Sequence, residues 1–201
     1  MSKYYIVKYS GPFGFIKPWT AVRDSETFSQ QFLTPSIVEG IERKLFPELL
    51  GTTGIMKIKR HRLSYQQVSQ QQEVIQTRGW NSTRKGKEYL FERPQAILLR
   101  GVLLNPVLHL AFEDKTDAER AFQQHICLCR NEDVVLPAVL DEVLEEDFDA
   151  HTGKYPGFEL IFEKSEEAFQ VGFNRHTKEA MYGWLKIIGT PVTNEHETDL
   201  R

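Results

Sequence analysis

Near its start the chain reads Lys3-Tyr4-Tyr5-Ile6-Val7-Lys8-Tyr9, a run rich in aromatic and β-branched residues. Such residues favour a pleated, half-buried strand. The run ends at Ser10-Gly11-Pro12, which is a turn signal. We therefore predict that the chain opens with a β-strand.

A helix follows an irregular loop. Thr34-Pro35 provides an N-cap with proline at the first helical position, and Ile37, Ile41 and Leu45 recur at a spacing of four before Pro47 ends the pattern. Further strands are predicted at 55–65, at 96–112 as a strand pair or one kinked strand, and at 158–162, with a helix over 114–129 capped near Thr116 or Asp117. This order is βαββαβ, so the predicted fold class is α+β with a ferredoxin-like body.

The remaining segments extend this body. Residues 66–95 contain few aliphatic side chains, a Gln-rich patch and a dense cluster of charges, which indicates a long hairpin or a mobile loop inserted between two strands. We call residues 66–95 the thumb. Residues 168–173 and 181–188 favour a small hairpin, and 191–201 a frayed tail. We expect a single domain over 1–201, with an acidic segment and C-terminal extension over about 131–201.

Composition and charge narrow the class of protein. The chain has 201 residues, of which 40% are hydrophobic and 26% charged, as in globular proteins. Its two cysteines, Cys127 and Cys129, are too few and too close for a disulfide scaffold. No apolar run approaches a membrane span and the start has no hydrophobic signal core, so we expect a cytoplasmic protein with no membrane partner.

The net charge of −3 hides an asymmetry between the two halves of the chain. Residues 1–100 carry 16 Lys and Arg against 8 Asp and Glu, whereas residues 101–201 carry 9 against 20. The halves therefore have net charges of +8 and −11. Such polarity is expected when one face binds a polyanion, although charged halves of a sequence need not become faces in space.

Two basic clusters have the residue types that bind RNA. The first is the strand from Lys57 to Tyr65, in which alternation predicts an exposed basic face; the alternative is an ordinary solvated sheet surface. The second lies in the thumb, where Trp80 and Tyr89 are interleaved with cations and glycines. Aromatic side chains stack on bases and cations neutralise phosphates, although an unstructured hairpin tip is also possible.

No motif predicts a catalytic or metal centre. Cys127 and Cys129 with His125 lack a second ligand pair for zinc, and the acidic residues from Glu132 to Asp149 lack the spacing of a calcium loop. A solvated or protein-contacting face is the better interpretation of that acidic segment. The six histidines are scattered, and no P-loop or dinucleotide fingerprint occurs. We predict no cofactor.

A family resemblance rests on several stretches: Tyr4 to Gly11, Lys17-Pro18, Ser25 to Ser36 and Glu39-Gly40-Ile41. Together with Leu98-Leu99-Arg100 after the thumb, they resemble the CRISPR-associated protein five family, nearest to its type I-C form, over roughly residues 3–145. The resemblance implies a RAMP-type ferredoxin-like subunit that caps the 5′ handle of the guide RNA in a type I surveillance complex. Its partners would be the guide RNA, the backbone and large subunits and, indirectly, target DNA.

The resemblance also implies which residues would contact RNA, and it leaves cleavage open. The type I-C form is implied to mature its own guide with a tyrosine and a Lys-His pair, but Gln30 and Glu119-Arg120 stand near those positions here. Binding without catalysis is therefore our leading hypothesis. The alternatives are a metal-independent endoribonuclease with His61 or Tyr65 as its base, and an interaction protein with no RNA role. The predicted RNA-binding residues are Lys17, Arg23, Lys57, Lys59, Arg60, His61, Arg62, Tyr65, Arg78, Trp80, Arg84, Lys85, Lys87 and Tyr89.

Overall fold

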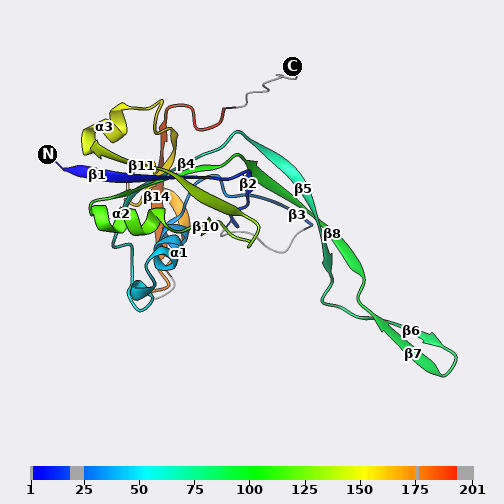
Figure 1. Cartoon of the computed structure of the whole chain (residues 1–201). Coiled ribbons are helices and arrows are strands. Elements are labelled where there is room, and N and C mark those ends of the chain that lie inside the picture. Colours follow the sequence, from blue (N-terminus) through cyan, green and yellow to red (C-terminus); the bar gives the residue numbers. More distant parts are fainter. Residues whose placement is uncertain (1, 19–24, 175–176, 194–201) are drawn as a thin grey trace, which may run out of the picture.

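A large, mostly antiparallel sheet forms the body of the protein. The computed structural model describes residues 2–18, 25–174 and 177–193. The strands of the sheet lie in the order β10-β11-β1-β9-β4-β12-β14-β13. Their bounds are β1 Lys3–Ser10, β4 Ile58–Ser64, β9 Val107–Phe112, β10 Ile126–Cys127, β11 Val134–Leu144, β12 Gly157–Ile161, β13 Phe169–Phe173 and β14 Ala180–Ile188. The protein is thus a mixed α+β structure in which strands predominate (Figure 1).

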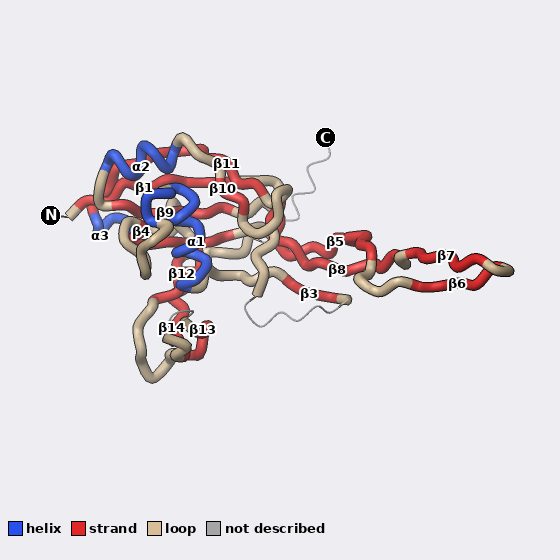
Figure 2. The backbone as a smooth tube through the Cα atoms, turned by 90° about the horizontal axis from the view of Figure 1, so that it is seen from below, coloured by secondary structure: helices blue, strands red, loops and turns tan. Residues whose placement is uncertain are grey.

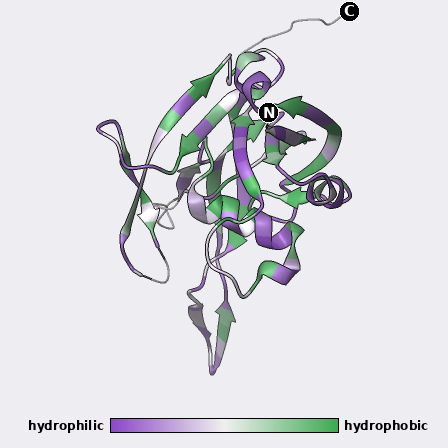
Figure 3. Cartoon of the chain, turned by 90° about the vertical axis from the view of Figure 1, so that its left-hand side faces the viewer, coloured by the Kyte–Doolittle hydropathy of each residue, from purple (hydrophilic) through white to green (hydrophobic). Residues whose placement is uncertain are grey.

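The alternation in the opening strand decides which helix covers which face of the sheet. On β1, Val7 and Tyr9 point into the main core, which they share with α1 (Pro35–Leu45) and α2 (Lys115–Phe122). Tyr4 and Ile6 point the opposite way, into a smaller cluster with Phe148 of α3 (Glu145–Ala150). Figure 3 shows hydrophobic and hydrophilic bands along the strands of the sheet. The sheet is therefore buried on both faces at its centre.

A buried carboxylate joins α1 to the next strand. Glu42 is almost fully buried, and its side-chain oxygens accept hydrogen bonds from the backbone N–H groups of Met56, Lys57 and Ile58, at 2.5 to 3.1 Å. The turn after α1 includes the 3₁₀ helix η1 (Pro47–Leu49). Met56 and Lys57 precede β4, so the carboxylate accepts from backbone donors that have no strand partner and fixes the start of β4.

The thumb is a long hairpin that leaves the body at one end of the sheet. Its stem is formed by β5 (Gln67–Gln76) paired with β8 (Gln95–Leu104), and its tip by β6 (Asn81–Lys85) paired with β7 (Glu88–Glu92). Two short strands, β2 (Phe13–Gly14) and β3 (Glu26–Phe28), pair with the body end of β8. Figures 1 and 2 show the tip well away from the rest of the molecule. Of the two alternatives given for 66–95, the structure forms the long hairpin, and its second stem strand continues to Leu104.

Several predicted boundaries are confirmed and two are wrong. The helix after Thr34-Pro35, the strand pair after 95 and the terminal hairpin form as expected. The helix predicted to reach Cys129 ends at Phe122, because its residues 126–127 form β10 instead. Its N-cap is Asp114, whose side chain accepts from the backbone N–H groups of Thr116 and Asp117.

After the second helix and the two-residue β10 comes the long strand β11, which the sequence pattern does not predict. Residues 158–162 were expected to take that place, but β12 lies on the far side of β4 instead. β11 pairs with the whole of β1 from Leu136 to Leu144, with a register shift that leaves Ala138 as an extra residue. On its outer edge, β10 covers only Val134 and Val135; from Leu136 onward β11 has no strand partner among the described residues.

Candidate nucleic-acid interface

One face of the thumb tip combines aromatic rings with a guanidinium. Tyr89 and Phe91 are two residues apart on β7 and therefore share a face, where their rings stack with centroids 6.5 Å apart. Arg84 is the cross-strand partner of Tyr89, and its guanidinium lies 5.9 Å from that ring. Tyr89 and Phe91 are 60% and 64% exposed. The tip thus presents a solvent-exposed stacking surface that has no packing role in the fold.

A second aromatic and cation pair lies where the tip meets the stem. The guanidinium of Arg93 lies 4.5 Å from the ring of Trp80, which is 58% exposed. Residues 77–94 carry five cations and two carboxylates. None of these five cations forms an ion pair with any residue that the structure describes. The thumb can therefore offer unpaired positive charge and flat rings to a ligand at the same time.

The basic strand predicted to face solvent is mostly turned inward, which corrects the sequence interpretation. Arg62 is fully buried: it donates to the backbone carbonyls of Phe148 and Tyr155 at 2.7 and 2.9 Å and pairs with Glu159 and Asp149. Arg60 pairs with the same two carboxylates. The two guanidinium groups are not available to a ligand, because carboxylates from α3 and β12 neutralise them inside the protein.

Burial and pairing shift the pKa values of this cluster in different directions. Burial would raise the pKa of the Asp149 carboxyl, but hydrogen bonds from Lys186 and Arg60 outweigh it and lower that pKa to about 2. Burial lowers the pKa of Arg62, against the opposing effect of Glu159. Asp149 and Glu159 neutralise two of the three positive charges of the cluster, so the two arginines offer little positive field to a nucleic acid.

His61 and Tyr65 are not placed to act as a catalytic base. His61 is 4% exposed, its ring stacks on Phe162 with centroids 5.2 Å apart, and burial lowers its pKa to about 4. Tyr65 is buried as well, and its hydroxyl donates to the side-chain oxygen of Gln31. A base that activates a ribose hydroxyl must reach that hydroxyl, and neither group reaches the surface. The geometry gives no support to the endoribonuclease hypothesis.

The other predicted site residues are scattered. Lys57 pairs with Asp117 at 2.5 Å and Lys59 with Glu113 at 3.3 Å. Lys17 is exposed near the base of the thumb, and Arg23 lies outside the described residues. At the positions considered for catalysis, Gln30 lies before α1, whereas Arg120 on α2 pairs with Glu48. Of the predicted site residues that the structure describes, only those of the thumb therefore lie together on one exposed surface.

Sequence reasoning missed three residues of the thumb surface. Leu90 and Phe91 on β7 are more than half exposed, and Arg93 covers Trp80. The run Tyr89-Leu90-Phe91 between charged residues was the available signal, since three large apolar side chains at the tip of an inserted hairpin have no core to fill. Phe28 on β3 is a further exposed aromatic residue that the sequence pattern did not indicate.

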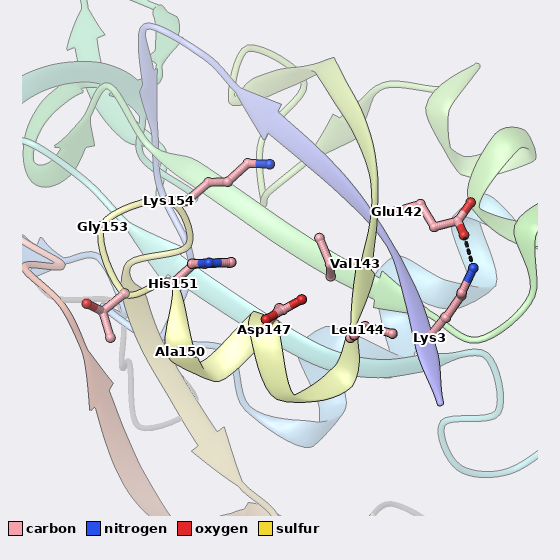
Figure 4. Close-up of a pocket in the computed structure, with 10 residues that line it drawn as sticks. Lys3, Glu142, Val143, Leu144, Asp147, Ala150, His151, Gly153 and Lys154 are labelled. Atoms are coloured by element: carbon pink, nitrogen blue, oxygen red, sulfur yellow. Dashed lines mark hydrogen bonds and ion pairs between the residues drawn. The ribbon is translucent and has the colours of Figure 1, made fainter. Parts of the chain in front are cut away.

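Another cavity lies at the end of the body opposite the thumb. It has a volume of about 760 Å³ and lies between β1, β11 and the loop after α3. Figure 4 shows the Lys3–Glu142 ion pair on one side and His151 and Lys154 on the other. Within the described ranges, no cluster of His, Cys, Asp or Glu could hold a metal ion. Both ions of that pair are half-exposed, so the cavity is an open, solvated depression.

The comparisons with known proteins give a fold and no family. No family model and no curated protein matches the sequence. Among solved structures, a chain described as "CRISPR RNA-guided surveillance complex" has a similar fold: the TM-score is 0.53 at 9% sequence identity, covering 94% of this chain and 90% of that chain. At this identity the likeness shows a shared fold. In the part of the chain that the structure describes, no helix is long and apolar enough to cross a membrane.

Proposed function

We propose that this protein is an RNA-binding subunit of a CRISPR RNA-guided surveillance complex and that it holds the 5′ handle of the guide RNA. Its body would be a single ferredoxin-like, RAMP-type domain. The strand order β11-β1-β9-β4, all antiparallel and with α1 and α2 on one face, supports this. In order along the chain these strands are the fourth, first, third and second of a βαββαβ unit.

The observation that carries the proposal is the thumb. The exposed rings of this two-stranded hairpin do not stabilise the fold, because the tip has no core to pack against. Stacking on such rings contributes roughly 1–3 kcal/mol per base, and it needs no particular sequence. The net charge of residues 77–94 is +3, which favours a polyanion over an apolar partner. Single-stranded RNA is the ligand that uses both features.

The fold likeness supports the assignment to a complex. A similar fold occurs in a chain of a surveillance complex, and the similarity extends over nearly the whole of both chains. The sequence resemblance points to the subunit that caps the 5′ handle. Partners would then be guide RNA, neighbouring backbone and large subunits and, through them, target DNA, in a cytoplasmic ribonucleoprotein.

RNA binding by the purified chain tests the proposal. We expect repeat-derived RNA to bind with an affinity that falls steeply with salt, and the double variant Trp80→Ala, Arg84→Ala to bind at least tenfold more weakly. The salt slope should fall by about 0.7 for the lost cation. The chain offers a matched control in Lys164 and Tyr182, an exposed cation and ring outside the thumb, 5.4 Å apart.

The outcomes are distinct. If the control variant Lys164→Ala, Tyr182→Ala binds RNA as well as the unmodified chain while the thumb variant does not, the thumb assignment stands. Equal affinity of both variants would reject the thumb as the RNA-binding surface. If the unmodified chain binds no repeat RNA even at low salt, the proposed function fails.

A further inference from the structure

A cavity at the base of the thumb has the chemistry of a nucleobase site. It has a volume of about 410 Å³, which is in the range of small-molecule pockets. Among the described residues its lining contains three phenylalanines, three amide or hydroxyl side chains and no charged side chain; the residues are Pro18, Phe28, Ser29, Gln30, Gln31, Phe32, Phe158 and Leu185. A site without charge does not suit a phosphate, whereas rings and amides suit a flat heterocycle with polar edges.

The wall of this cavity that carries Phe28 is held in place by backbone hydrogen bonds. Ser29 donates its backbone N–H to the carbonyl of Gly101 at 2.7 Å, and Gln30 donates to the carbonyl of Ile16 at 2.7 Å. The buried Ser29 hydroxyl accepts from the backbone N–H of Ile16 at 2.9 Å. The segment therefore does not need to order itself when a ligand binds.

Phe28 is positioned by a glycine. A Cβ built on Gly101 would overlap the Phe28 ring, so the ring lies directly on the bare backbone of β8. The ring is nevertheless 48% exposed, which is unusual for a side chain so closely seated. The missing side chain at 101 thus supports a ring whose remaining surface is available for stacking.

The two glutamines supply hydrogen-bonding groups at the same wall. The side-chain oxygen of Gln31 accepts from the Tyr65 hydroxyl, which orients this amide and leaves its NH₂ group to donate elsewhere. The Gln30 amide makes no hydrogen bond with any described residue. Amide groups beside a stacking ring are the arrangement by which proteins recognise the edge of an unpaired base.

The cavity is continuous with the thumb. Phe28 belongs to β3, which pairs with β8, the same strand that runs out into the thumb (Figure 2). Exposed Lys17 adjoins Pro18 at the rim and could meet a phosphate there. An RNA strand on the thumb would therefore pass this cavity where it reaches the body.

We propose that the cavity takes one unpaired nucleobase of the bound RNA, stacked on Phe28 with its edge at Gln30 and Gln31. This inference rests on the proposed function and adds a base-specific site to it. The thumb would supply affinity for any sequence, whereas this cavity would fix one position of the strand.

The test combines protein variants with RNA that lacks one base. A series of repeat RNAs, each with an abasic residue at a different position, is titrated against the unmodified full chain. We expect one position at which loss of the base weakens binding by about 5-fold to 100-fold. Phe28→Ala should weaken binding of intact RNA by a similar factor, and the abasic RNA should bind Phe28→Ala no more weakly than intact RNA does.

Controls separate this inference from the proposed function. Gln30→Leu keeps the volume and removes the amide, so it should reduce discrimination between bases at the mapped position. Tyr182→Ala, an exposed ring outside the cavity, should leave every RNA unaffected. If Phe28→Ala binds intact RNA normally while the thumb variant does not, the base site is rejected and the proposed function stands. If no RNA binds the unmodified chain, both are rejected.

Discussion

Replacing Arg62 with methionine should destabilise the protein strongly without touching an RNA contact. Arg62 is completely buried, its guanidinium lies 3.7 Å from the Phe148 ring, and it satisfies two backbone carbonyls and two carboxylates. Methionine keeps much of the volume but supplies no donor. Removing one partner of a buried ion pair costs about 3–5 kcal/mol, because the other charge remains inside without compensation.

Thermal unfolding followed by circular dichroism, together with urea denaturation, measures this loss. For a chain of this size each kcal/mol lowers Tm by about 2–4 °C, so we expect Arg62→Met to lower Tm by about 6–20 °C. Lys59→Met is the matched control on the same strand. Its ion pair with Glu113 is exposed, so the expected loss is below about 1 kcal/mol.

Two results would refute this reasoning. One is a loss of stability for Arg62→Met no larger than that for Lys59→Met. The other is a folded Arg62→Met protein with normal stability and weakened RNA binding, which would mean that Arg62 faces the ligand as the sequence pattern suggested.

Two further predictions concern acid stability and the start of β4. Burial lowers the pKa of His61 to about 4 and that of His109 to about 3, against about 6.5 when unfolded. Below pH 6.5 the two histidines are therefore protonated in the unfolded chain but stay neutral in the native state. The free energy of unfolding then falls by up to about 1.4 kcal/mol per pH unit for each histidine. Urea denaturation between pH 7.5 and 4.5 should show this fall, and His61→Phe and His109→Phe should each flatten it; an unchanged slope in both would contradict the prediction. Glu42→Ala should cost about 2–4 kcal/mol by urea denaturation because three backbone donors lose a charged acceptor. Glu48→Ala, which breaks a solvent-exposed pair, should leave the urea midpoint nearly unchanged, and equal losses for the two variants would contradict the role assigned to Glu42.

Local patterns predicted those parts of the fold that local physics determines. The alternation in β1, the Thr34-Pro35 helix start and the hairpin character of the thumb all depend on neighbours in sequence. The thumb surface was predictable for the same reason, because a stretch that cannot reach a core must expose its rings.

The errors came from contacts over long sequence separations. Arg62 looked solvent-facing because the carboxylates that bury it, Asp149 and Glu159, lie 87 and 97 residues further along the chain. β11 was missed because Pro137, Asp141 and Glu142 disfavour a strand locally, whereas pairing with β1 overrides that preference. The site beside Phe28 could not be predicted from the sequence either, because the Phe28 ring is positioned by Gly101, a residue distant in the sequence.

The unpaired outer edge of β11 bears on how the protein avoids self-association. An open strand edge offers backbone groups to any other strand, and two copies could join through it. Here that stretch contains a proline, which has no N–H to donate, an extra residue at Ala138 that breaks the regular spacing, and the carboxylates Asp141 and Glu142. In a second copy the same edge would bring like charges together. The acidic segment therefore protects the sheet against edge-to-edge aggregation, whatever else it contacts.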